Sequence, residues 1–145
     1  MIFRTVCVAL AVGLGATAVV AQSNPIAERR EIMKGVGSAA KNGAQLARGN
    51  VPYDNAKAQE VFATYAAAAA KMPSLYPDNS KTGGETTASP KIWEDMAGFK
   101  AAFGKFEADS KAAQASIKDI DSFKTAFGDM GKQCGACHEV YRIKK

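Results

Sequence analysis

Five residues near the C-terminus, Cys134-Gly135-Ala136-Cys137-His138, place two thiols and an imidazole within a short stretch of chain. Two cysteines at this spacing lie on one side of a helical turn, where both thiols can form thioethers with the two vinyl groups of a porphyrin. The adjacent imidazole can then reach the iron, and C-x-x-C-H is typical of covalent haem attachment. The motif therefore predicts one haem c (heme c) bound through Cys134 and Cys137, with His138 as an iron ligand.

Two other uses of a C-x-x-C pair fit the rest of the chain less well. A structural zinc site needs four ligands, but His138 is the only histidine, and the third cysteine, Cys7, lies in a segment that is predicted to be removed. A thioredoxin-like motif needs a βαβ context, and the chain has no run of alternating β-branched residues. A disulfide or an inert helix end remains as the alternative. The single histidine also limits the chain to one haem and excludes bis-histidine ligation.

Residues 1–21 have the pattern of a secretory signal peptide. Arg4 supplies a positive charge, residues 5–20 form an almost unbroken apolar run, and the run is short for a bilayer span. We predict cleavage after Ala21, which leaves a periplasmic chain of residues 22–145 with no integral membrane segment. An uncleaved N-terminal anchor is the alternative. Export agrees with the haem motif, because bacteria attach haem to such cysteines outside the cytoplasm.

The composition limits the classes of function. The chain after cleavage is long enough for one domain with a core but too short for two. The net charge of the full chain is +5 at pH 7, and two haem propionates would lower it, so the charge gives no reason to expect nucleic-acid binding. No pair of nucleophile and base stands out, and the only imidazole is assigned to iron. We therefore predict that the protein is not an enzyme, and a redox enzyme or sensor remains as an alternative.

From residue 24 onward the pattern is helical throughout, and we predict four helices. Each predicted start carries a capping residue, and two of these are followed by a proline at the first helical position. The predicted starts are Asn24-Pro25, Asp54, Ser89-Pro90 and Asp119. The first helix is predicted to end at Gly49 and the second at Pro73, whereas the third runs unbroken from Pro90. Residues 73–89 make a long connection for a compact domain, so we expect them to cover or recognise something.

Apolar side chains recur along one side of the predicted helices at helical spacings. On the last helix the residues are Ile120, Phe123, Phe127, Met130, Cys134, Cys137 and Tyr141. The haem cysteines therefore continue the core side of this helix, and the haem is predicted to lie inside the bundle. On the first helix the residues are Ile26, Met33, Val36, Ala40 and Ala47, and Arg29 falls among them. A buried arginine needs a partner, which a haem propionate would provide, unless the stem of Arg29 snorkels to the end of the bundle.

Four amphipathic helices with short first and third connections predict an all-α fold, an up-down-up-down antiparallel four-helix bundle with one covalent haem near the end of helix four. Three stretches of this chain resemble the cytochrome c′ family, the class II c-type cytochromes. They are Arg29-x-x-x-Met33, Pro90-Lys91-Ile92-Trp93 and Cys134-x-x-Cys137-His138-x-x-Tyr141-Arg142. The resemblance covers residues 24–145, and the C-terminal place of the haem motif is its most specific part.

The resemblance implies one of two functions, which differ on the side of the iron opposite His138. One branch of the family is low-spin and six-coordinate, has a methionine from the first helix as the sixth ligand, and carries electrons. The other is high-spin and five-coordinate and binds NO or CO. Met33 occupies the deciding position, and its surroundings are more like the low-spin branch. We therefore predict a periplasmic one-electron carrier with His138 and Met33 as metal ligands, and the gas-binding protein remains the alternative.

The same bundle geometry and resemblance place the other candidate residues. Met33 and Met96 fall near the layer of the iron, but Met96 and Met72 are expected to fill the core. By resemblance and by position, Arg29 and Arg142 are expected near the propionates and the proximal edge of the haem. The expected partner is an unidentified redox protein, and a homodimer is possible.

Overall fold

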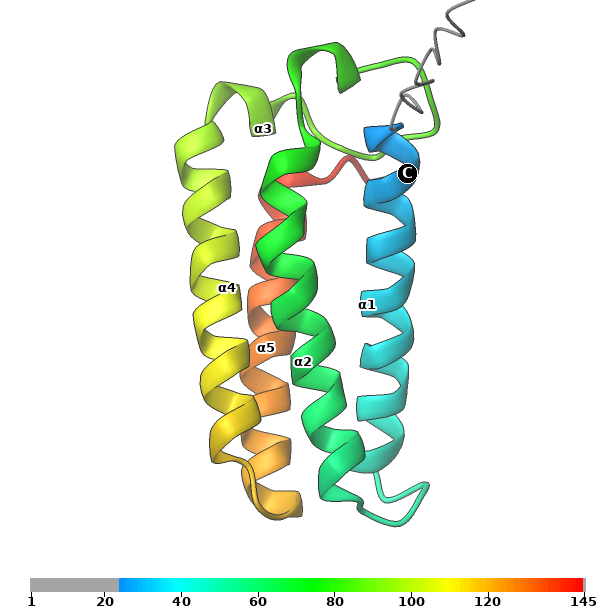
Figure 1. The fold of residues 1–145 in the computed structure, drawn as a ribbon, viewed down its shortest axis with the longest axis vertical. Coiled ribbons are helices and arrows are strands. Elements are labelled where there is room, and N and C mark those ends of the chain that lie inside the picture. The colour runs from blue at the N-terminus through cyan, green and yellow to red at the C-terminus, as the bar shows by residue number, and fades with distance from the viewer. Residues whose placement is uncertain (1–23, 145) are drawn as a thin grey trace, which may run out of the picture.

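The computed structural model describes residues 24–144, and most of this part of the chain is helical (Figure 1). Four long helices form an antiparallel up-down-up-down bundle, which confirms the predicted fold class. The elements are α1 (Pro25–Ala47), α2 (Asn55–Lys71), the 3₁₀ helices η1 (Met72–Leu75) and η2 (Asp78–Ser80), α3 (Lys91–Glu94), α4 (Met96–Ser116) and α5 (Ile120–Tyr141). The predicted signal peptide, residues 1–21, lies outside the described residues. Among residues 24–144, no helix is both long and apolar enough to cross a membrane.

Three of the four predicted helix starts are confirmed by their caps. The side chain of Asn24 accepts hydrogen bonds from the backbone N–H groups of Ile26 and Ala27, both at 3.1 Å, and Pro25 follows as the first helical residue. Asp54 caps α2, and Asp119 caps α5 in a capping box. These side chains satisfy N–H groups that the first helical turn leaves without backbone partners.

The third predicted helix is interrupted, and the prediction of one unbroken helix from Pro90 is wrong. Asp95 leaves the helical conformation, with φ −131° and ψ 55°, and its side chain accepts a hydrogen bond at 3.1 Å from the N–H of Gly98. The chain therefore makes the single turn α3 first, and α4 begins at Met96 with Asp95 as its N-cap. An aspartate favours this position because it competes with helical hydrogen bonding inside a helix and caps a new one well.

Two apolar clusters fill the bundle at different heights. The lower cluster in Figure 1 is built around Phe62 of α2 and Phe123 of α5, whose ring centroids lie 5.7 Å apart. The upper cluster, at the end where α1 begins, is built around Phe99 and Phe103 of α4, with centroids 5.0 Å apart. Edge-to-face aromatic contacts of this kind stabilise a core beyond the area that they bury. The clusters anchor α5 at its start and α4 near its start.

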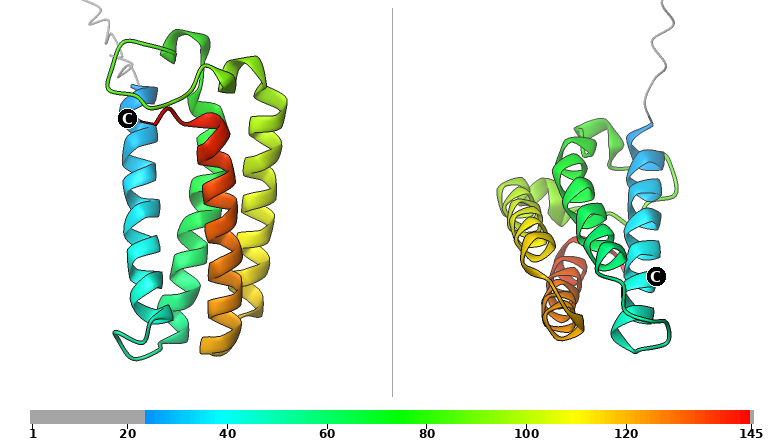
Figure 2. Two further views of the ribbon diagram at one scale, coloured as in Figure 1. Left: turned by 180° about the vertical axis from the view of Figure 1, so that it is seen from behind. Right: turned by 60° about the horizontal axis from the view of Figure 1, so that its bottom comes forward.

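The helices α1 and α5, which form the near side in the left view of Figure 2, approach each other closely in the lower half of the bundle. The contact lies at Gly43 of α1, where an added Cβ would collide with the ring of Phe127. Gly43 is buried together with Ala39 and Leu46, whereas the predicted core residues Val36 and Ala40 are only partly buried. In the lower half of α1, the residues that face the core therefore lie one position before the predicted ones.

Candidate haem site

The C-x-x-C-H motif lies near the end of α5 and lines a cavity of about 520 Å³ that also reaches α1. A second cavity of about 370 Å³ adjoins it between α5 and α4. The side chains that line both are Met33, Val36, Phe103, Cys134, Cys137, His138 and Tyr141. All six predicted site residues line the larger cavity, so the structure brings the predicted site together from the two ends of the sequence.

Cys134 and Cys137 lie one helical turn apart and are both half-buried. They are free cysteines in the structure and are not joined in a disulfide. Burial raises the pKa of both thiols, and the neighbouring Cys134 adds to the rise at Cys137. Both are therefore protonated thiols at neutral pH, the state from which an S–H bond can add across a vinyl group.

His138 follows on the next position of the helix and also lines the larger cavity. Partial burial, and to a smaller degree the charge of Arg142, lower the pKa of this imidazole below its usual value. The ring is therefore neutral at pH 7 and keeps a nitrogen lone pair for a metal.

Met33 is the methionine that lines both cavities on the α1 side. It is partly buried and packs against the upper apolar cluster. Met72 also lines the larger cavity but is only 1% exposed, whereas Met96 lines neither cavity. A thioether on α1 and an imidazole on α5 thus face the same space from two helices.

The walls of the two cavities fit a flat, mostly apolar group. Ala68 and Ala69 of α2 and Phe103 of α4 contribute small or aromatic apolar surface. Two cations, Arg29 and Arg142, also line the larger cavity. An apolar interior with two thiols and one imidazole on α5 is the donor set that a covalent haem c requires.

Comparisons with known proteins agree with this chemistry. A model of the family described as Cytochrome C′ matches residues 24–142. A cytochrome c′ from Rhodopseudomonas palustris is 42% identical over 145 residues, which cover 100% of this chain and 99% of the relative. The chain belongs to the cytochrome c′ family. A cytochrome c-556 from the same organism, also similar to this chain, is 35% identical over 98% of each protein.

Solved structures give the same result. The structure of cytochrome c′ from R. palustris superposes with a TM-score of 0.82 at 43% identity, over 86% of this chain and 99% of that one. A structure of R. palustris cytochrome c556 superposes with a TM-score of 0.77 at 30% identity, over the same fractions. A nitric oxide complex of a mutant cytochrome c′ from Alcaligenes xylosoxidans, at 27% identity, covers 83% of this chain and 94% of that one with a TM-score of 0.72.

Membership of the cytochrome c′ family confirms three predictions: the family itself, the four-helix bundle and one covalently bound haem c. The protein is a c-type cytochrome. The relatives named above are cytochromes, as the haem motif and the resemblance led us to expect.

Arg29 is 4% exposed, so its stem does not carry the guanidinium out to solvent. Nη1 donates to the carbonyl oxygen of Leu75 at 3.2 Å and to Oγ of Ser80 at 3.1 Å, while Nη2 donates to the Ser80 carbonyl at 3.0 Å. The guanidinium also lies 4.4 Å from the ring centroid of Tyr76. Burial lowers the pKa of Arg29, and burial raises that of Tyr76 to about 12. Arg29 thus binds the connection between α2 and α3. Its guanidinium has further N–H groups that could donate to a propionate, and that contact stays a prediction.

The connection between α2 and α3, which we expected to cover or recognise something, covers part of the larger cavity. Thr86, Thr87 and Ala88 line the larger cavity. The same segment pairs with the chain after α5, because the N–H of Ile143 donates to the Thr87 carbonyl at 2.8 Å and an isolated bridge joins Ala88 to Arg142. The exposed side chain of Arg142 therefore sits at the rim of the cavity, above the turn that carries the haem motif.

Sequence reasoning missed the residues that hold the site in place. Gly43 sets the close approach of α1 and α5, and the pattern that could have shown it is a glycine among the small residues of α1. Ser80 binds Arg29, but no local signal connects a serine in a turn-rich segment with an arginine far away in the chain. The helix break at Asp95 was missed because the apolar spacing continues on both sides of it. An aspartate three residues before Gly98 is nevertheless typical of a helix N-cap.

Proposed function

We propose that this cytochrome is a periplasmic one-electron carrier with a low-spin haem, whose iron His138 and Met33 would hold. The haem would be held by thioethers to Cys134 and Cys137 and would supply one-electron redox chemistry. The observation that carries the proposal is that Met33 and His138 line the same two cavities from different helices, α1 and α5. A thioether is a soft ligand that suits low-spin haem iron and raises its reduction potential.

Each residue in this proposal has a definite task. The partly buried Met33 would occupy the side of the iron opposite His138, so that no position stays open for a substrate. The apolar walls around Phe103 would keep water from the iron and help to set its potential. Arg29 and Arg142 would lie near the propionates, where a cation favours the electron-rich ferrous state.

The deciding experiment compares Met33→Ala with Met96→Ala. We expect a low-spin visible spectrum in the wild type, a high-spin spectrum and rapid CO binding in Met33→Ala, and a wild-type spectrum in Met96→Ala. Met96 is the matched control because it lies in the same upper cluster but lines neither cavity. A wild-type protein that is high-spin and binds CO at neutral pH would refute ligation by Met33.

That last outcome would support the second candidate function, a five-coordinate cytochrome c′ that binds NO or CO. The specific observation in its favour is that relatives named cytochrome c′ are similar over the whole chain, and one related structure is a nitric oxide complex. If this chain has that function, Met33 would not bind the iron but would block access to it, and NO or CO would have to displace the side chain.

The compartment and the partner complete the proposal. Cleavage after Ala21 should place a protein that starts at Gln22 in the periplasmic fraction, and N-terminal sequencing of that fraction tests it.

The redox partner would meet the end of the bundle that holds the haem, where Lys132 and Lys144 are exposed. Lys132 is paired with Asp129 at 2.8 Å, so its contribution to such an encounter is reduced. A homodimer stays a further possibility that sedimentation of the holoprotein would decide.

A further inference from the structure

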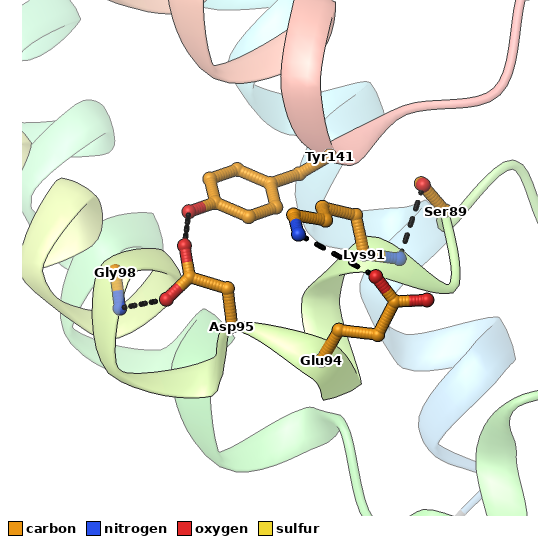
Figure 3. A network of polar contacts seen from close by, with 6 residues as sticks. All are labelled: Ser89, Lys91, Glu94, Asp95, Gly98 and Tyr141. Carbon is orange, nitrogen blue, oxygen red and sulfur yellow. Dashed lines mark hydrogen bonds and ion pairs between the residues drawn. The ribbon is translucent and has the colours of Figure 1, made fainter.

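The end of α5, directly after the haem motif, is attached to the segment around α3 at three points. The N–H of Ser89 donates to the Tyr141 carbonyl at 3.0 Å, and the N–H of Ile143 donates to the Thr87 carbonyl at 2.8 Å. The hydroxyl of Tyr141 donates to Oδ2 of Asp95 at 2.9 Å (Figure 3). The turn that carries Cys137 and His138 is therefore fixed on its C-terminal side.

Asp95 has two roles, because its two carboxylate oxygens bind different elements. Oδ2 accepts the hydrogen bond from Tyr141 of α5, and Oδ1 accepts the one from the N–H of Gly98 at the start of α4 (Figure 3). Gly98 suits this arrangement because a Cβ there would collide with the carboxylate. The hydrogen bond from Tyr141, followed by that from Gly98, lowers the pKa of Asp95. The carboxylate is thus ionised at neutral pH and makes stronger hydrogen bonds than a neutral acceptor.

Tyr141 is also part of the candidate haem site. Tyr141 is one helical turn beyond Cys137, on the same side of α5, and it lines both cavities. Its ring meets Phe99 of α4 edge to face, with centroids 5.2 Å apart and an interplanar angle of 77°. One side chain therefore forms a wall of the site and also connects α5 to the start of α4.

The position of this end of α5 is not set by packing on α1. The two helices meet at Gly43 and Phe127 in the lower half of the bundle, whereas the cavities separate them at the level of His138. Where α5 lies at that level depends on contacts with other elements. Just before the motif, Nε2 of Gln133 donates to Oδ2 of Asp109 of α4 at 2.8 Å, and just after it Tyr141 contacts Phe99 and Asp95.

We propose that Tyr141 and Asp95 are positioning residues, which fix the turn of α5 that carries His138 and so the separation across the cavity that Met33 must span. This inference rests on the proposed function, since the separation matters most for a protein with two axial ligands. Neither residue need touch the haem iron for this role, because both act through the orientation of α5.

The test uses the holoprotein and two variants that separate the roles of these side chains. Tyr141→Phe keeps the ring against Phe99 and removes only the hydroxyl. Asp95→Ser keeps a good N-cap for α4 but is too short to reach Tyr141. We expect both variants to raise the high-spin fraction and to speed CO binding to the ferrous protein several-fold. The double variant should show no larger change than either single one, because all three lose the same hydrogen bond.

Tyr53→Phe is the matched control. The hydroxyl of Tyr53 donates to Oδ1 of Asn55 at 2.7 Å, at the opposite end of the bundle. This variant loses a tyrosine hydrogen bond of the same kind, so it should change thermal stability without changing spin state or CO binding. If Tyr141→Phe behaves like Tyr53→Phe, with only a change in melting temperature, Tyr141 has a merely structural role and the inference is overturned.

A separate measurement keeps this test distinct from that of Met33. The iron–histidine stretching vibration of the five-coordinate ferrous protein can be recorded by resonance Raman spectroscopy, in Met33→Ala or, if the wild type already has an open position, in the wild type. Tyr141→Phe in the same background should shift this band, and Tyr53→Phe should not. A high-spin wild type whose band shifts in Tyr141→Phe would refute ligation by Met33 but support the positioning role. An unshifted band would contradict the positioning role whether the wild type is high-spin or low-spin.

Discussion

Replacing Arg29 by methionine is expected to destabilise the protein strongly, because this side chain holds the connection between α2 and α3 on α1. Arg29→Met keeps a long flexible stem and removes all three hydrogen bonds to Leu75 and Ser80. Hydrogen bonds from a charged donor contribute about 1.5–3 kcal/mol each to stability. Since one guanidinium makes all three and its own burial is costly, we expect a net loss of about 2–4 kcal/mol.

That loss would be a large part of the stability of a small domain, which is about 5–15 kcal/mol. The assay is unfolding of the ferric holoprotein in guanidinium chloride, followed by circular dichroism. Arg29→Lys keeps the charge but has only one nitrogen, so it should lose about half as much. Hydrogen exchange gives a local readout, because the N–H of Ser80 donates to the Pro77 carbonyl at 2.9 Å and should exchange faster when the segment is released.

Arg30 on the same turn is the matched control. Its Nη2 lies 2.9 Å from Oε2 of Glu85, but the two side chains are 49% and 76% exposed. Exposed ion pairs contribute about 0–1 kcal/mol, so Arg30→Met should unfold almost like the wild type. An Arg29→Met protein as stable as Arg30→Met, or a Ser80 amide with unchanged exchange, would refute the anchoring role.

Three further predictions use other parts of the molecule. Intact mass should show residues 22–145 plus one haem that survives acid-acetone extraction, and extractable haem would contradict thioether attachment. Arg142→Gln should lower the reduction potential because it removes a cation from the rim of the cavity, and an unchanged potential in a voltammetric measurement would place Arg142 away from the haem. Hydrogen bonds at the start of α5 lower the pKa of Asp119 from 3.8, so its contribution to stability is present above about pH 4 and is lost as the pH falls through the lowered value. Asp119→Asn keeps a cap without a titrating group, and acid unfolding curves that fall as steeply in this variant as in the wild type would disprove that contribution.

The parts of the fold that the sequence predicted are those determined by neighbours in the chain. The caps at Asn24, Asp54 and Asp119 bind backbone groups within three residues, so a short window contains the whole interaction. The haem motif is predictable for the same reason, because the two thiols and the imidazole lie in one short stretch of a single helix, Cys134 to His138. Asp95 was missed because the apolar spacing continues on both sides of it and conceals the break.

The parts that sequence reasoning missed depend on residues distant in the chain. Ser80 is 51 positions from Arg29, and no periodicity relates the two. The close approach at Gly43 depends on where Phe127 of α5 packs, so the spacing on α1 alone could not show which of two neighbouring sides faces the core. Periodicity identifies an amphipathic helix but not its exact rotation in a bundle.

The position of the haem site follows from a change in side-chain size along α5. In the lower half, Phe123, Phe127 and Met130 face the core, and large side chains fill the space up to α1. From Cys134 onward the two cysteines that line the cavities are much smaller than these side chains, and Met33 and Val36 of α1, which line both cavities, are only partly buried. Helices of a closely packed bundle cannot fill such a space by themselves. The two cavities are therefore a consequence of the same residues that attach the haem: the cysteines that would form the thioethers are also small enough to leave room for the group they hold.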